Sequence, residues 1–128
     1  MSYRWVDHTA EVELHVEAPT EADVLEDALK AVAELLDGGT GEPQTRYVRL
    51  EAPDRGALLV RWLEELVFLA ETAGFIPEDA ELTLNDGLEA TVRGRTAEPR
   101  PLVKAVTYHG LEFGPAGDGW QAKVVLDV

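Results

Sequence analysis

Along this chain the spacing of hydrophobic residues switches between every second residue, as in a strand, and every third or fourth, as in a helix. The order of these switches constrains the fold more than any other feature. Residues 11–17 read Glu-Val-Glu-Leu-His-Val-Glu, an alternation typical of a half-buried strand. Residues 21–36 and 56–72 instead place apolar side chains at helical spacing. The order strand, helix, strand, helix and then mainly strands predicts an α+β fold, with two helices packed on one face of a mostly antiparallel sheet.

Short polar residues and glycines mark the ends of the two expected helices. Thr20 and Asp54 precede the helical segments and are predicted N-caps, because their side-chain oxygens can accept hydrogen bonds from the first turn. Gly38 and Gly39 are expected to end the first helix, and Gly74 the second.

The second helix has the wider apolar stripe, and we expect it to be the better buried of the two. Trp62 and Phe68 lie at helical spacing within it and are expected in the core. Further strands are predicted at 47–52, 80–85, 88–96, 103–113 and 121–128. Asn85-Asp86-Gly87 is a typical hairpin turn, and 114–119 a Gly- and Pro-rich loop.

A chain of 128 residues with 45% hydrophobic side chains fits one domain spanning residues 1–128. It has no cysteine, which excludes disulfides, a thiol nucleophile and Cys-ligated zinc and suits a reducing cytoplasm. The N-terminus lacks the apolar core of a signal peptide, and no apolar run approaches the roughly 20 residues that span a bilayer. We therefore expect a cytoplasmic protein that does not bind membranes.

The net charge of −14 is the strongest constraint on partners. Nucleic-acid phosphates would repel such a chain, and its eleven Lys and Arg residues are scattered, so direct RNA or DNA binding is not expected. A cation or a basic protein partner fits the charge better. Solubility alone is the competing interpretation.

Ligand-type side chains gather in Asp7-His8-Thr9-Ala10-Glu11, just where the first alternating segment begins. One interpretation is a polar turn that leads into a hairpin, and the other is half of a metal or recognition site. Asp127 is the penultimate residue and Val128 carries a terminal carboxylate. If the first and last alternating strands pair, Glu11 and Asp127 would meet at one rim, with oxygen donors that Ca²⁺, Mg²⁺ or Mn²⁺ prefer. A solvated surface charge remains the alternative for each acid.

Several enzyme classes are excluded or disfavoured by missing motifs. Ser2 is the only serine, which argues strongly against a catalytic serine triad. The sequence also has no P-loop and no dinucleotide-binding glycine motif. A stand-alone metal-dependent hydrolase that uses Glu11, Asp127 and a histidine stays open. A chaperone-like interaction module, in which the acids are only surface charges, is a further alternative.

Five segments, in order and over nearly the whole chain, resemble the archease family. They are Asp-His-Thr-Ala-Glu at 7–11, the helical segments 20–28 and 58–75, Val-Lys-Ala-Val-Thr-Tyr-His-Gly-Leu at 103–111, and 120–128 with its Asp-plus-aliphatic ending. The resemblance implies a protein cofactor of an RtcB-type RNA ligase that is not itself an enzyme. Such a cofactor promotes guanylylation of the ligase's active-site histidine and multiple turnover in tRNA splicing or RNA repair.

The resemblance also implies a divalent cation held by Glu11, Asp127 and Val128, with Ca²⁺ expected first and Mg²⁺ or Mn²⁺ as alternatives. The family usually has Asp where this chain has Glu11, and the extra methylene can displace, weaken or retune the site. Lys104 matches a lysine that is important for activation in the family. Asp7 and His8 are expected to orient the ligands or hold the local structure rather than to bind the metal.

Overall fold

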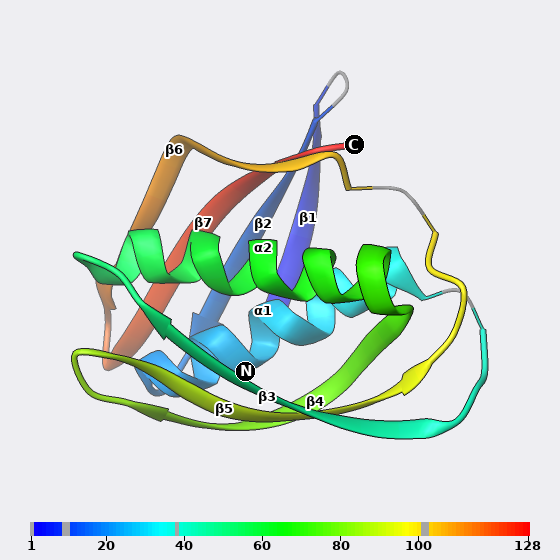
Figure 1. Ribbon diagram of the computed structural model, residues 1–128. Helices are drawn as coiled ribbons and strands as arrows, with labels where there is room; N and C mark the ends of the chain where they lie inside the picture. The colour runs from blue at the N-terminus through cyan, green and yellow to red at the C-terminus, as the bar shows by residue number, and fades with distance from the viewer. Residues whose placement is uncertain (1, 9–10, 38, 101–102) are drawn as a thin grey trace.

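The computed structural model describes residues 2–8, 11–37, 39–100 and 103–128, except the side chains of Asp7 and His8. Helices and strands follow the predicted order, with one additional strand at the start of the chain (Figure 1). Their bounds are β1 Ser2–His8, β2 Glu11–Ala18, α1 Glu21–Leu36, β3 Pro43–Glu51, α2 Arg55–Ala73, β4 Phe75–Leu84, β5 Gly87–Thr96, β6 Ala105–Ala116 and β7 Gly119–Asp127. Among these residues, no helix combines the length and the apolar character needed to cross a membrane.

The strands form two antiparallel sheets, in the orders β1-β2-β7-β6 and β3-β5-β4. Both helices lie between the sheets in Figure 1, and both contact strands of each: α1 packs on β2 and β4, and α2 on β6 and β4. The expected α+β fold with two helices on antiparallel strands is confirmed. The structure adds that there are two sheets, and the wide apolar stripe of α2 contacts strands of both.

Both predicted helix caps are present. Thr20 Oγ1 accepts a hydrogen bond from the N–H of Asp23 at 3.1 Å, and Asp54 Oδ1 accepts one from Ala57 at 2.8 Å. Gly74 ends α2 in the left-handed conformation, with φ of 65°. At the end of α1, Gly38 lies outside the described residues.

The first strand is the main element that the sequence did not predict. Residues 2–8 form β1, which pairs with β2 over seven residues in antiparallel register. Its signal was short but present, because Tyr3 and Trp5 alternate with polar side chains and pack against the core. Strands β3 and β4 also begin earlier than expected, at Pro43 and Phe75.

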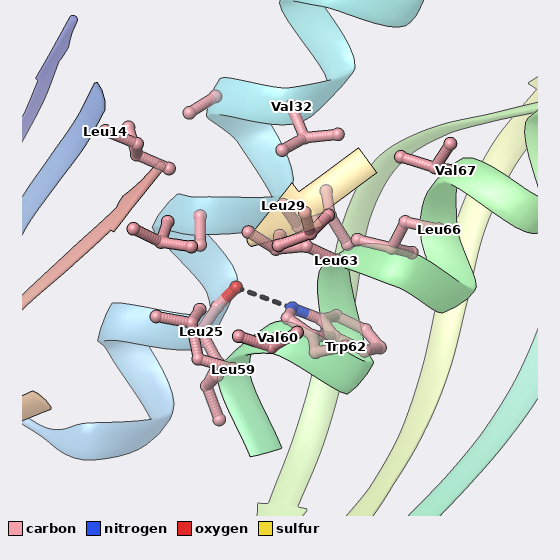
Figure 2. Close-up of a cluster of buried hydrophobic side chains, with 14 of the residues drawn as sticks. Leu14, Leu25, Leu29, Val32, Leu59, Val60, Trp62, Leu63, Leu66 and Val67 are labelled. Carbon is pink, nitrogen blue, oxygen red and sulfur yellow. Dashed lines mark hydrogen bonds between the residues drawn. The ribbon is translucent and has the colours of Figure 1, made fainter. Parts of the chain in front are cut away.

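Trp62 joins the two helices at the centre of the core (Figure 2). Its side chain is fully buried, and Nε1 donates a hydrogen bond to the carbonyl oxygen of Leu25 at 2.9 Å. The prediction that Phe68 is also core was wrong, because its side chain is 55% exposed. Phe68 lies four residues after Glu64 and three before Glu71, which puts it on the solvent face of α2.

The four-stranded sheet has one face on the helices and one open face. On β2, Leu14, Val16 and Ala18 are buried on the helix side. Because side chains alternate along a strand, Glu11 and His15 lie on the open face. The polar half of the first alternating segment is therefore available for chemistry.

Candidate functional site

Strand register brings Glu11 and Asp127 together. Strands β2 and β7 are antiparallel neighbours, and Glu11 pairs directly with Asp127. Directly paired residues project to the same face, with Cβ atoms about 4.5–5.5 Å apart. Both residues are partly buried. The expected meeting of the first and last alternating strands is confirmed.

The two flanking strands reach the same end of the sheet. His8 of β1 pairs with Glu11, and Ala105 at the start of β6 pairs with Asp127. The N–H of Lys104 donates a hydrogen bond to the carbonyl oxygen of Asp127 at 2.8 Å, and the Lys104 side chain is exposed. In Figure 1 the chain's C-terminal end lies beside the start of β6. We call this end of the sheet, with Glu11, Lys104, Asp127 and Val128, the rim.

The structure places the remaining predicted residues only in part. Val128 follows β7 directly and is partly buried. The backbone of Asp7 pairs with Val12, but the side chains of Asp7 and His8 lie outside what the structure describes. Their expected supporting role therefore stays a prediction.

The donors at the rim suit a hard cation. Carboxylate oxygens are the ligands that Ca²⁺, Mg²⁺ and Mn²⁺ prefer, and Glu11 and Asp127 present two of them at paired positions. Among the described side chains, no three His, Cys, Asp or Glu residues lie close enough to hold a metal. In the described part of the chain, further ligands would be backbone or terminal oxygens, or water, as in many Ca²⁺ sites.

A hydrogen-bonded network on the open face was missed by the sequence reasoning. Arg4 Nη2 contacts His15 Nδ1 at 3.2 Å, and His15 Nε2 contacts Glu13 Oε2 at 2.7 Å. On the neighbouring strands, Lys123 Nζ lies 3.1 Å from Glu112 Oε2. The hydrogen bond and charge of Glu112, with a further contribution from Glu13, raise the pKa of Lys123.

This network occupies the same face as the rim and crosses all four strands. The alternation at 11–17 was the available signal, since it puts Glu13 and His15 on one face with Glu11. Their partners on β1, β6 and β7 could not be read from the sequence, because alternation does not state which strands pair.

Comparisons with known proteins agree with the fold. A model of the Archease protein family (MTH1598/TM1083) matches residues 3–128. The chain is 33% identical to protein archease of Methanosarcina acetivorans, over 98% of this chain and 95% of that one. It is 31% identical to protein archease of Archaeoglobus fulgidus, over 100% of both chains.

Solved structures share the architecture. The solution structure of Methanobacterium thermoautotrophicum protein 1598 superposes with a TM-score of 0.73 at 27% identity, over 98% of each chain. The crystal structure of an archease from Thermotoga maritima, described as a possible chaperone, gives a TM-score of 0.67 at 24% identity and covers 96% of this chain and 94% of that one. With a family model that spans residues 3–128 and full-length relatives above 30% identity, this chain belongs to the archease family.

Proposed function

We propose that this chain is a protein cofactor of an RtcB-type RNA ligase. It would promote guanylylation of the ligase's active-site histidine and multiple turnover in tRNA splicing or RNA repair, without catalysing ligation itself. The observation that carries the proposal is the convergence of Glu11, Asp127 and Lys104 at one rim of an archease-family chain.

A divalent cation at the rim is part of the proposal, with Ca²⁺ as the first candidate and Mg²⁺ or Mn²⁺ as alternatives. Glu11 and Asp127 would hold it, together with the carboxylate of Val128 where the chain ends there. Two carboxylates at paired positions repel each other, and a cation between them relieves that repulsion. Bound there, the ion would add positive charge where the phosphates of GTP react.

The chain's own residues would position the complex. The exposed ammonium group of Lys104 is a compact charge that suits a phosphate or a carboxylate of the partner. The net charge of −14 would steer the rim towards a ligase cleft that is basic because it binds RNA and GTP. The net charge would act at long range, while the two proteins approach each other, and Lys104 would act at short range, once they are in contact.

Guanylylation of the cognate ligase, followed with labelled GTP and substoichiometric amounts of this protein, tests the proposal. We expect the wild type to raise the rate and Asp127→Asn and Lys104→Ala to reduce the stimulation at least tenfold. Asp118→Asn is the matched control for the acid, because Asp118 lies in the turn at the other end of β7. Lys30→Ala on α1 is the control for the lysine.

Two results would contradict the proposal. The wild type could fail to stimulate a ligase whose own activity has been verified. Alternatively, the protein alone could hydrolyse phosphoesters in Mn²⁺ with dependence on Asp127, which would favour the metal-dependent hydrolase instead.

A further inference from the structure

The pairing between β6 and β7 is interrupted just beyond the rim. Thr107 pairs with Val125, and the next pair joins Glu112 to Lys123. Residues 108–111 of β6 therefore face a single residue of β7, Val124. This bulge is larger than the common type, in which two residues oppose one.

The bulge turns an aromatic side chain towards solvent. Val106 is buried on the helix side, and strict alternation would bury Tyr108 on the same side. Tyr108 is instead 58% exposed. Gly110 makes the turn possible with φ of 67°, a conformation that other residues rarely adopt. Bulges are over-represented at sheet edges, where β6 lies, and next to functional sites, where they re-aim a side chain.

Position distinguishes Tyr108 from the other exposed aromatics. In the described part of the chain three large hydrophobic side chains are exposed: Tyr47, Phe68 and Tyr108. Tyr47 lies on β3 in the other sheet and Phe68 on α2. Tyr108 lies only four residues from Lys104, which limits their Cα separation to about 14 Å. A partner bound at the rim is therefore within reach of Tyr108.

The charge around Tyr108 also differs from that of the rest of the molecule. Residues 99–111 contain no Asp or Glu, although 25 of the 128 residues are acidic. Lys104 and His109 lie on either side of Tyr108 in the sequence, and the side chains of both are exposed. This stretch therefore suits an apolar part of the partner's surface beside the basic cleft, which attracts the acidic remainder of the molecule.

We propose that the bulge, residues 108–111, is a docking element that holds the ligase, with Tyr108 as its anchor. Tyrosine is enriched among the residues that dominate protein interfaces, since its ring buries a large area and its hydroxyl keeps a polar contact. The bulge sets the affinity, whereas the rim sets the rate of the guanylylation step. Docking of this kind presupposes the cofactor role proposed above.

Two measurements on the same variants separate docking from activation. Isothermal titration calorimetry of the full-length protein with the cognate ligase gives Kd, and guanylylation at saturating cofactor gives the maximal rate. We expect Tyr108→Ala to raise Kd about tenfold or more and to leave the maximal rate unchanged. Tyr108→Phe should keep most of the affinity. Tyr47→Ala is the matched control, because Tyr47 is 66% exposed and should leave Kd unchanged.

The outcomes also separate this inference from the proposed function. Wild-type Kd in Tyr108→Ala, or a reduced maximal rate with unchanged Kd, would overturn docking through the bulge. Binding that depends on Tyr108 without any stimulation would retain docking and reject the activator role. Binding of tRNA fragments by the protein alone that is lost in Tyr108→Ala would assign the bulge to RNA and overturn the inference. Equal melting temperatures of the variants exclude misfolding as the cause.

Discussion

Asp27 is the one buried charged side chain in the described part of the chain. It lies on α1 with 4% of its surface exposed, and its Oδ2 has no hydrogen-bond partner among the described residues. Burial disfavours the ionised form and raises the pKa of Asp27, and the charge of Lys30 only partly offsets this. The folded state therefore binds the Asp27 proton more tightly than the unfolded state does.

Neutralising Asp27 should stabilise the protein at neutral pH. Because the pKa of Asp27 is raised in the folded state, protonated Asp27 contributes to the free energy of unfolding. That contribution is fully present below the pKa of the unfolded state and is lost as the pH rises through the pKa of the folded state. Asp27→Asn should therefore raise the melting temperature at pH 7 by about 2–5 °C, and the gain should shrink towards pH 4. Differential scanning calorimetry across this range checks the expectation. The exposed Glu34→Gln on α1 is the control, and a gain independent of pH would refute the role of ionisation.

The contacts of His15 define its tautomer. Arginine only donates, so Arg4 Nη2 requires His15 Nδ1 to accept, and the ring proton must lie on Nε2, which donates to Glu13. Long-range ¹H–¹⁵N NMR at mildly alkaline pH should show the Nε2–H tautomer in the wild type. Arg4→Ala should shift the ring towards a mixture, whereas Arg61→Ala on α2 should not. A dominant Nδ1–H form in the wild type would exclude this arrangement.

At the level of secondary structure, the contact between Trp62 and Leu25 locks the two helices together. Trp62→Phe removes the donor and leaves unfilled volume in a fully buried position. We expect a loss of about 1–3 kcal/mol in the free energy of unfolding, measured by urea denaturation. Trp120→Phe, at a partly buried position on β7, should cost less. Equal losses for the two variants would show that the hydrogen bond and the burial of Trp62 contribute little.

Elements with strong local signals were predictable, and pairing was not. Both helices and their caps follow from apolar spacing and from Thr20 and Asp54, which are local features. The division into two sheets depends on which strands pair, and the bulge depends on the register between β6 and β7. Read alone, residues 103–113 look like an uninterrupted strand, so the exposure of Tyr108 could not be foreseen.

The candidate site was predictable to the extent that it rests on alternation and family resemblance. Glu11 and Asp127 were expected to meet if their strands paired, and the register shows that they do. The roles of these acids, of Val128 and of Lys104 remain predictions. The network of Arg4, His15 and Lys123 was missed because its members come from three strands that are far apart in the sequence.

For the whole molecule, a bound divalent cation should act as a stabilising ligand. If the rim binds Ca²⁺, saturation at about one hundred times Kd should stabilise the protein by about 2.7 kcal/mol, which thermal melts would detect as a higher transition temperature. Chelation with EDTA should reverse the shift. Asp127→Asn should abolish it, and Asp118→Asn should preserve it. If Ca²⁺ still raises the melting temperature of Asp127→Asn, the ion binds at a site other than the rim.

The position of β7 between β2 and β6 has a consequence for the order in which the protein matures during synthesis. A ribosome makes β2 well before β6, yet neither strand can pair with β7, which lies between them, until β7 itself has emerged. Contacts between such distant segments form slowly, since a long loop must close first. A nascent chain interrupted before β7 would leave the inner edges of β2 and β6 unpaired and would have no rim. The pairing of Glu11 with Asp127 therefore cannot form before β7 has left the ribosome.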